Sequence, residues 1–200
     1  DRVACIFPFE YDVYKEAGAK VEFVGHPLVD IVKSSMTINE ANAFAGKKEG
    51  RKLILLMPGS RLMEIEKMLP TLLEAAKIIQ KQLPEVDFVM PRAGTIPLNL
   101  LEEKIQASGL DVSITEGHNY DLFSVADLAL ATSGTVTLEA ALCGLGSVIV
   151  YRTNPLTYMI AKLVVNIPHI GLPNIVAGRS VVPELIQNDF TPAKVAKAAM

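Results

Sequence analysis

Short apolar runs alternate with amphipathic segments over much of this chain, and this alternation restricts the fold more than any other feature. The runs that we expect to be strands are residues 53–57, 86–90, 112–114, 127–131 and 147–151. The segments that we expect to be helices are residues 62–82, 97–108, 120–125 and 135–143. Such alternation is typical of parallel sheets whose strands are joined by right-handed helical crossovers. The sequence therefore predicts an α/β fold with a doubly wound, Rossmann-like parallel sheet.

The two ends of the chain are less regular. Residues 3–7 and 21–24 are predicted to be short strands around a helix at 10–17, and a further helix is expected to end near residue 33. The polar stretch 34–52 is predicted to be a linker or an exposed excursion. Towards the other end we expect a mostly apolar helix at 155–165, a helix near 184–188 and a last helix that opens at 191–193.

The first predicted strand of the alternation leads into Pro58-Gly59-Ser60-Arg61, a turn suited to bind an anion. Ser60 is a good N-cap for the helix that follows. The first backbone N–H groups of that helix are expected to be unpaired, and the helix dipole adds partial positive charge. Arg61 adds a full charge on a planar fork that matches phosphate. A ligand that carries phosphate is therefore expected here.

A second strand-to-helix turn, from Thr132 to Glu139, has a similar design. Its small residues let a ligand approach the backbone, and the hydroxyls of Ser133, Thr135 and Thr137 are candidate donors to phosphate or sugar oxygens. Glu139 lies one helical turn beyond Thr135 on the same face, where a carboxylate can accept from both hydroxyls of a ribose. Both turns would lie at the carboxyl ends of parallel strands, where such folds bind ligands.

Each of these motifs also has a simpler structural interpretation. A Pro-Gly-Ser turn is often only a helix cap, and Glu139 alone would more often be a solvated helix residue than a ligand. Two turns of the anion-binding type in one domain favour a site. The familiar nucleotide motifs do not fit, because G-x-x-x-x-G-K-[ST] is absent and Gly144-Leu145-Gly146 follows a predicted helix, the reverse of the dinucleotide fingerprint.

Six short motifs follow one another along nearly the whole chain. They are F-P-F-E at 7–10, F-V-G-H-P-L at 23–28, P-G-S-R-x-x-E-I at 58–65, S-G-T-x-T-L-E-A-A-L at 133–142, L-P-N at 172–174 and P-E-L-I-Q at 183–187. In this order they resemble the carboxyl-terminal half of the lipid-A-disaccharide synthase family, bacterial glycosyltransferases with the two-domain GT-B fold. The resemblance implies that residues 1–24 are a remnant of the amino-terminal GT-B domain. It also implies that residues 25–200 are a UDP-sugar-binding domain truncated at its end.

The resemblance implies an activity and a set of donor-binding residues. The expected reaction transfers diacylglucosamine from UDP-diacylglucosamine to diacylglucosamine 1-phosphate, which yields lipid A disaccharide 1-phosphate and UDP. The expected substrate-binding residues are Gly59, Ser60, Arg61, Glu64, Gly117, His118, Ser133, Gly134, Thr135, Glu139, Asn174 and Gln187. Arg61 would stabilise the leaving diphosphate, Glu139 would bind the ribose, and the loop at 116–119 would contact the uracil through its backbone. Asn174 would contact the donor, or it would only turn the chain after Pro173.

The catalytic general base is expected in the amino-terminal domain, so this chain alone is expected to be inactive. Two other functions stay open. One is another UDP-sugar enzyme of the GT-B fold, such as the peptidoglycan glucosaminyltransferase or a UDP-sugar epimerase. The other is a non-catalytic nucleotide-binding module.

Composition narrows the expected partners. With 19 basic and 22 acidic residues the net charge is −3, which argues against a nucleic-acid-binding surface. The two cysteines, Cys5 and Cys143, lack metal-ligand spacing, and free thiols in a reducing cytoplasm are the default interpretation. The three histidines are scattered and no Asp-x-Asp pair occurs, so we expect neither a metal nor another cofactor.

The acceptor implied by the resemblance is a lipid, yet we expect no membrane-spanning helix. The apolar stretch 127–151 contains three glycines and a cluster of hydroxyl residues, which suits a strand, a helix and a strand better than one spanning helix. We therefore expect a cytoplasmic protein that associates peripherally with the inner membrane, with the apolar helix at 155–165 as the candidate contact surface. That helix would otherwise pack on the sheet or on the missing domain. The sequence leaves open whether the protein forms a homodimer.

Overall fold

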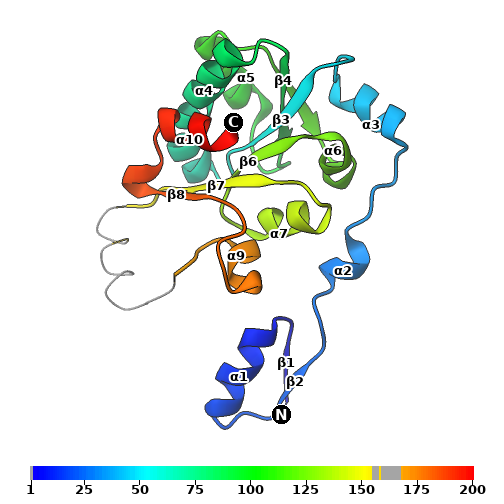
Figure 1. Cartoon of the computed structure of the whole chain (residues 1–200), viewed down its shortest axis with the longest axis vertical. Coiled ribbons are helices and arrows are strands. Elements are labelled where there is room, and N and C mark those ends of the chain that lie inside the picture. Colours follow the sequence, from blue (N-terminus) through cyan, green and yellow to red (C-terminus); the bar gives the residue numbers. More distant parts are fainter. Residues whose placement is uncertain (1, 155–157, 159–167) are drawn as a thin grey trace.

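The computed structural model describes residues 2–154, 158 and 168–200, and the strands in this part form two separate parallel sheets (Figure 1). The larger sheet has the strand order β5-β4-β3-β6-β7-β8, and every neighbouring pair is parallel. Its strands are β3 (Lys52–Met57), β4 (Val86–Arg92), β5 (Val112–Glu116), β6 (Leu128–Thr132), β7 (Ser147–Tyr151) and β8 (Glu184–Ile186). The predicted doubly wound parallel sheet is confirmed.

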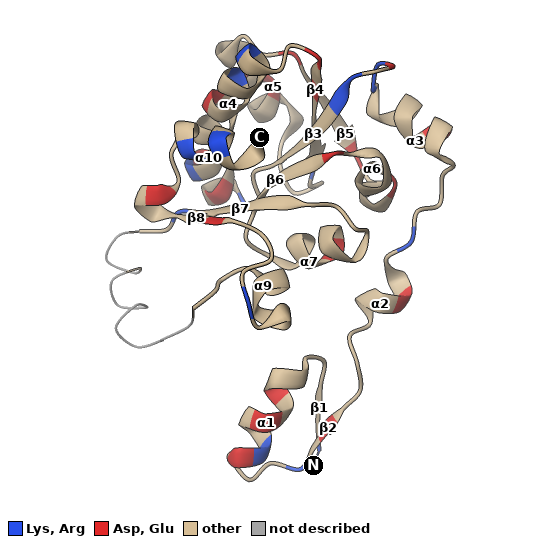
Figure 2. Cartoon of the chain, in the orientation of Figure 1, with Lys and Arg blue, Asp and Glu red and all other residues tan. Residues whose placement is uncertain are grey.

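Helices cover both faces of this sheet (Figure 1). One face carries α4 (Leu62–Gln82), α5 (Leu98–Ser108) and α10 (Pro192–Ala199). The other face carries α3 (Ile38–Ala45), α6 (Asn119–Val125) and α7 (Thr135–Leu142), and α9 (Leu172–Ala177) packs against α7. Basic and acidic residues are interspersed along the exposed side of α4, as expected for the polar face of an amphipathic helix (Figure 2).

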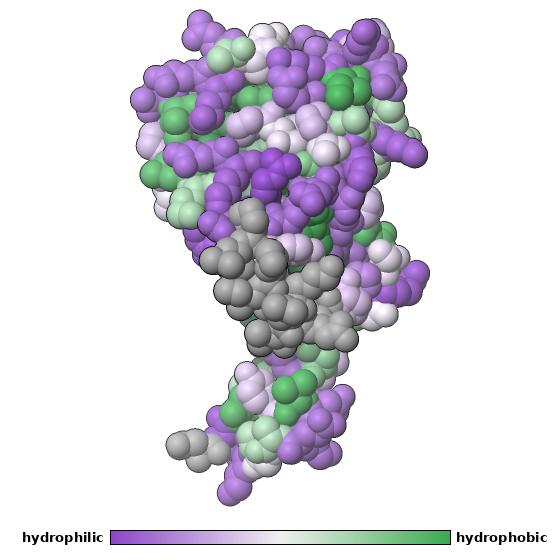
Figure 3. All heavy atoms as spheres, turned by 90° about the vertical axis from the view of Figure 1, so that its left-hand side faces the viewer, coloured by the Kyte–Doolittle hydropathy of each residue, from purple (hydrophilic) through white to green (hydrophobic). Residues whose placement is uncertain are grey.

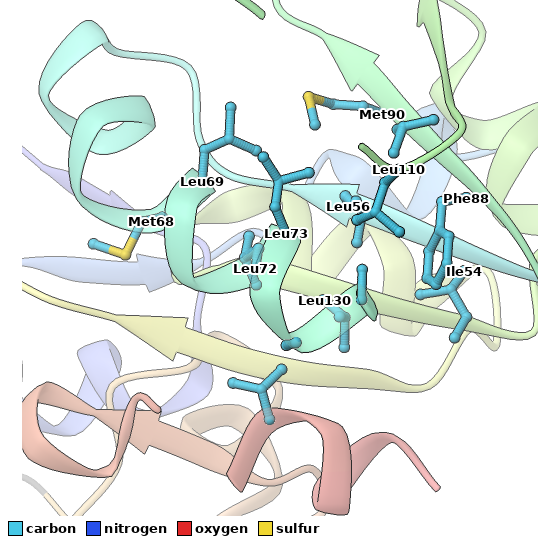
Figure 4. Packing of buried hydrophobic residues seen from close by; sticks show 14 of the residues in the cluster. Ile54, Leu56, Met68, Leu69, Leu72, Leu73, Phe88, Met90, Leu110 and Leu130 are labelled. Atoms are coloured by element: carbon cyan, nitrogen blue, oxygen red, sulfur yellow. The ribbon is translucent and has the colours of Figure 1, made fainter. Parts of the chain in front are cut away.

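The strand β3 shows why the sheet is apolar on both faces. Its side chains alternate, so that Ile54 and Leu56 belong to the core beneath α4, whereas Leu53, Leu55 and Met57 belong to the core beneath α6. Figure 4 shows the first of these cores, where leucines of α4 point onto the side chains of β3, β4 and β6. A strand that is buried on both faces reads as the continuous apolar run seen in the sequence.

The strand order places the two predicted anion turns next to each other. The chain moves outward from β3 through β4 to β5, then returns to pair β6 with the other side of β3. The parallel register of β3 and β6 brings Met57 opposite Ala131, so the two strands end side by side. Crossovers leave this point in opposite directions, and such a switch point at the carboxyl ends of strands is where open α/β sheets bind ligands.

The first residues form a small unit apart from the large sheet (Figure 1). It consists of β1 (Val3–Cys5), α1 (Pro8–Glu16) and β2 (Val21–Phe23), and a chain segment with the short helix α2 (Leu28–Ile31) connects it onward. Of its described residues only Cys5 is buried. Figure 3 shows apolar residues at the surface of this lower unit, where Val13 is 63% exposed. The boundary after residue 24 and the origin of residues 1–24 in another domain stay predictions.

Two predicted elements are wrong. The stretch 34–52 is not only a linker, because it contains α3, whose Ala41 and Ala45 are buried against the sheet. The helix expected near 184–188 is instead the edge strand β8 followed by the short 3-10 helix η1 (Gln187–Asp189). Both errors have the same cause, since short segments take their state from tertiary packing more than from local pattern. The predicted helix at 155–165 lies outside the described residues except for its position 158.

The buried carboxylate of Asp121, in α6, holds the chain segment that precedes α3. Asp121 is 3% exposed and accepts hydrogen bonds from the N–H groups of Ser35 (2.6 Å) and Met36 (2.7 Å) and from the Ser34 hydroxyl (2.8 Å). Burial raises the pKa of Asp121, but these bonds and a contact with His118 lower it more, so that the pKa lies well below its ordinary value. The bonded carboxylate therefore stabilises the helix whose first residue, Asn119, reaches the pocket described below.

Replacing this carboxylate tests that role. We expect Asp121→Asn to lower the free energy of unfolding by about 2 to 3 kcal/mol at neutral pH, because hydrogen bonds to a buried charged group are lost. Since the pKa is lower in the folded state, the stabilisation is present above the unfolded pKa and is lost as the pH falls below it. The difference between parent and variant in urea unfolding should therefore shrink from pH 5 towards pH 2. Asp111→Asn, on an exposed loop, is the control, and an equal effect there would contradict the assignment.

Candidate functional site

A pocket of about 490 Å³ opens at the switch point between β3 and β6. Both predicted anion turns line it, together with the end of β4 and the start of α6. The predicted residues that line it are Gly59, Ser60, Arg61, Glu64, Ser133, Gly134, Thr135 and Glu139. Residues far apart in the sequence therefore meet in one cavity, which the two separate motifs could not show by themselves.

The first turn is closed by one of its own side chains. The Glu64 carboxylate accepts hydrogen bonds from the N–H groups of Ser60 (2.8 Å) and Arg61 (3.2 Å), and it pairs with the Arg61 guanidinium at 3.0 Å. The predicted N-cap is therefore wrong, because the N-cap of α4 is Arg61 and not Ser60. The N–H groups of Ser60 and Arg61, which precede the first helical residue Leu62, already have an acceptor. The side chain of Arg61 is 81% exposed, so this ion pair contributes little to stability.

Gly59 shows how tightly this turn is built. Its φ is +117°, a conformation that residues with a side chain rarely adopt. A Cβ atom at this position would lie 2.3 Å from Oε2 and 2.6 Å from Cβ of Glu64. The glycine is therefore required by the backbone and by the approach of the Glu64 side chain.

The hydroxyls of the second turn differ in what they can offer a ligand. Ser133 donates to the carbonyl of Ile170 (3.0 Å), and Thr137 donates to the carbonyl of Gly134 (2.8 Å). The protons of both hydroxyls are thus used within the protein in this structure, and their donation to phosphate or sugar oxygens of a ligand stays a prediction. Thr135 is exposed at the pocket. Thr132, which also lines the pocket, has a buried hydroxyl with no hydrogen-bond partner in the described part of the chain.

Glu139 lines the pocket on the side of α7. Burial raises the pKa of the Glu139 carboxyl above its ordinary value. The pKa of the nearby Tyr120 phenol is also raised, first by burial of the phenol and then by the negative charge of Glu139. A partly desolvated carboxylate gains from two hydroxyl donors, which a ribose would supply. The position therefore suits the predicted role.

Arg92 lines the pocket but was not among the predicted residues. Arg92 ends β4 and is held in place by the carbonyl of Ile96 (2.7 Å) and by an ion pair with Glu116. Its position after the strand next to β3 could have indicated it, because the carboxyl ends of neighbouring parallel strands share one edge. Asn119, which also lines the pocket, is the last residue of the predicted uracil loop at 116–119.

Two predicted residues on that loop do not line the pocket. His118 has a positive φ of 54°. Its Nδ1 lies 3.1 Å from the Asp121 carboxylate, so the ring faces Asp121. Gly117, also with a positive φ, shapes the turn before it. Of the residues in this loop, Asn119 lines the pocket, whereas Glu116, Gly117 and His118 do not.

Asn174 and Gln187 also lie outside the lining of the pocket. Asn174 is fully buried in α9, where its amide bonds to the backbone of Val181 and Val182 and to Glu184. Asn174 therefore has a structural role, but it lies within α9 and does not turn the chain after Pro173. Its contact with the donor stays a prediction. The side chain of Gln187 accepts from the N–H of Thr153 at 3.0 Å.

No group of three or more His, Cys, Asp and Glu side chains gathers as a metal-binding set within the described ranges. In the same ranges no helix is long and apolar enough to cross a bilayer.

Solved structures define the class to which this fold belongs. A UDP-GlcNAc 2-epimerase from Methanocaldococcus jannaschii matches 98% of this chain and 53% of its own length, with a TM-score of 0.63 and 15% identity. A glycosyltransferase involved in lipopolysaccharide biosynthesis matches 98% of this chain and 52% of its own, with a TM-score of 0.59 and 15% identity. Likeness at such identities concerns the fold alone, and that fold is the one found in GT-B glycosyltransferases and epimerases.

Sequence relatives define the family. The family described as lipid-A-disaccharide synthetase matches residues 1–200, and the chain belongs to this glycosyltransferase family. The lipid-A-disaccharide synthase of Geobacter sulfurreducens is 45% identical over 98% of this chain, and that of Neisseria meningitidis serogroup A is 39% identical over 99%. The chain spans about half the length of these curated relatives, 51% and 52% respectively.

The two glycines of the pocket provide a matched pair for testing its geometry. Gly59→Ala should lower the free energy of unfolding by about 1 to 3 kcal/mol, because the new Cβ meets Glu64 and φ is positive. Gly134→Ala should change it by less than about 0.5 kcal/mol, since its φ of 169° is ordinary extended backbone and no atom lies within 4 Å. Chemical denaturation measures both, and equal losses would contradict the closed geometry of the first turn.

Proposed function

We propose that this chain is the donor-binding half of an enzyme that transfers diacylglucosamine from UDP-diacylglucosamine to diacylglucosamine 1-phosphate. The products are lipid A disaccharide 1-phosphate and UDP. The observation that carries this proposal is the pocket in which both anion turns meet. Membership of the lipid-A-disaccharide synthetase family supports the choice of donor and acceptor.

In this proposal the pocket holds the UDP moiety of the donor. The diphosphate lies between Arg61 of the first turn and the Gly134–Thr135 backbone of the second. Charge that develops on the diphosphate as the glycosidic bond breaks is stabilised by the arginine and by the amino-terminal end of α7. Glu139 accepts hydrogen bonds from the ribose hydroxyls, and the loop at 116–119 contacts the uracil.

The remaining predicted residues act from outside the pocket. Asn174 and Gln187 hold segments on either side of the 168–171 stretch, whose Ile170 carbonyl fixes the Ser133 hydroxyl. The general base that deprotonates the acceptor lies in the amino-terminal half of the enzyme, so both halves are needed for transfer.

The acceptor is a lipid, and we propose that the enzyme works in the cytoplasm at the surface of the inner membrane. The segment at 155–165 is the candidate contact with that surface. Neither a metal ion nor another cofactor is needed for donor binding, because arginine and backbone N–H groups neutralise the diphosphate.

The proposal is tested by incubating the intact enzyme with UDP-diacylglucosamine and diacylglucosamine 1-phosphate in EDTA. We expect release of UDP together with a disaccharide product. Activity only on UDP-N-acetylglucosamine, by epimerisation or by transfer to a peptidoglycan precursor, would overturn the proposal in favour of another enzyme of the same fold. Binding of UDP without turnover of any sugar donor would instead indicate a nucleotide-binding module.

Arg61 is expected to recognise phosphate and not the nucleoside. A charge-assisted contact is worth about 1.5 to 3 kcal/mol, so Arg61→Ala should weaken UDP binding by roughly ten- to a hundredfold and leave uridine binding nearly unchanged. Titration calorimetry with both ligands measures this difference. An equal loss for UDP and uridine would show that Arg61 shapes the pocket instead.

Glu139 is expected to recognise the ribose. Glu139→Gln should weaken UDP more than 2'-deoxy-UDP, because a neutral amide has only one oxygen to accept from two hydroxyls. The ratio of the two affinities, measured by titration calorimetry, should therefore fall towards one. An unchanged ratio with a lower melting temperature would assign Glu139 a structural role within α7.

A further inference from the structure

The Glu64 carboxylate occupies the place that the first turn would offer to a phosphate. One of its oxygens, Oε2, accepts from both the Ser60 and Arg61 N–H groups, and the other faces the Arg61 guanidinium. An oxyanion of a diphosphate would use the same backbone donors and the same arginine. The turn is thus already satisfied by an anion from its own helix.

A carboxylate and a phosphate cannot share these donors. Two anions within hydrogen-bond reach of the same N–H groups would repel each other strongly at such short separation. The pocket also gives Glu64 a route of departure, because its side chain lies on the first turn of α4 and borders the cavity. Arg61, its partner, is 81% exposed and is free to follow a ligand.

We propose that Glu64 is an internal ligand of the first anion turn, and that a phosphate of the donor displaces it on binding. Glu64 then weakens the apparent affinity for every ligand that uses the turn, because only molecules with the carboxylate displaced are competent to bind. It leaves a nucleoside without phosphate unaffected. Free phosphate is weakened by the same factor as UDP, but it lacks the ribose and base contacts that keep UDP bound.

Gly59 gives this arrangement a second support. The glycine allows the Glu64 side chain to pack where a Cβ atom would collide with it, so the turn accommodates this carboxylate at close range. The link between the Thr95 hydroxyl and the Ser60 carbonyl (2.7 Å) holds the turn from its other side. The backbone donors are therefore kept in place for whichever anion occupies them.

The inference rests on the proposed function and is tested by titration calorimetry of UDP on the intact protein. Glu64→Gln keeps the size of the side chain and removes its charge, and it should bind UDP roughly three- to tenfold more tightly than the parent. The shorter side chain of Glu64→Asp cannot reach the N–H groups of Ser60 and Arg61, so this variant should also bind UDP more tightly than the parent. Glu66→Gln, an exposed charge change on the same helix, should leave UDP unchanged, and uridine binding should not differ among these proteins.

The possible failures are distinguishable. Weaker UDP binding by folded Glu64→Gln and Glu64→Asp proteins would show that Glu64 supports the ligand, which overturns this inference and leaves the proposed function intact. Absence of UDP binding by the parent would remove the proposed function and the inference with it. If the variants do not fold, a structure of the parent with UDP decides, because Glu64 must then have left the N–H groups of Ser60 and Arg61.

Discussion

The parallel pairing of β3 with β6 is the interaction on which the rest of this structure depends. Paired positions of these strands lie 74 residues apart in the sequence, in the register Ile54 to Met57 against Leu128 to Ala131. Their pairing sets the point where the crossovers diverge. Both strands are buried on both faces, so the hydrophobic effect holds the pair in the core, and the backbone pairing sets their register. The two turns that follow them are brought together by this pairing and by nothing local to either turn.

The pocket at that edge combines opposite charges in a way that suits an exchange of anions. Arg61 is paired with Glu64, and Arg92 is paired with Glu116, so the arginines do not stand unneutralised in the free protein. The buried hydroxyl of Thr132, which has no partner among the described residues, is the kind of polar group that a ligand in the pocket can satisfy. The site is therefore built in advance, with one of its anion positions filled by the protein itself.

Much of the architecture could be predicted from the sequence, because a sheet buried on both faces leaves continuous apolar runs and its helices leave periodic ones. The long helix α4 has the predicted bounds at both ends. The short elements α3 and β8 could not be predicted, since their state depends on what they pack against. In the site, the motifs indicated Arg61 and Glu139, whereas the contact of Glu64 with the turn and the burial of Asn174 depend on side-chain positions that no spacing specifies. Arg92 was missed because no motif surrounds it.

We propose that the two turns form one site for the diphosphate of a nucleotide. Backbone NMR of the intact protein during titration with UDP tests this, with uridine as the comparison ligand. UDP should shift the N–H resonances of Ser60 and Arg61 and those of Gly134 and Thr135 along one binding curve, whereas uridine should leave the Ser60 and Arg61 resonances nearly unchanged. Shifts confined to one turn, or to residues far from both, would contradict it.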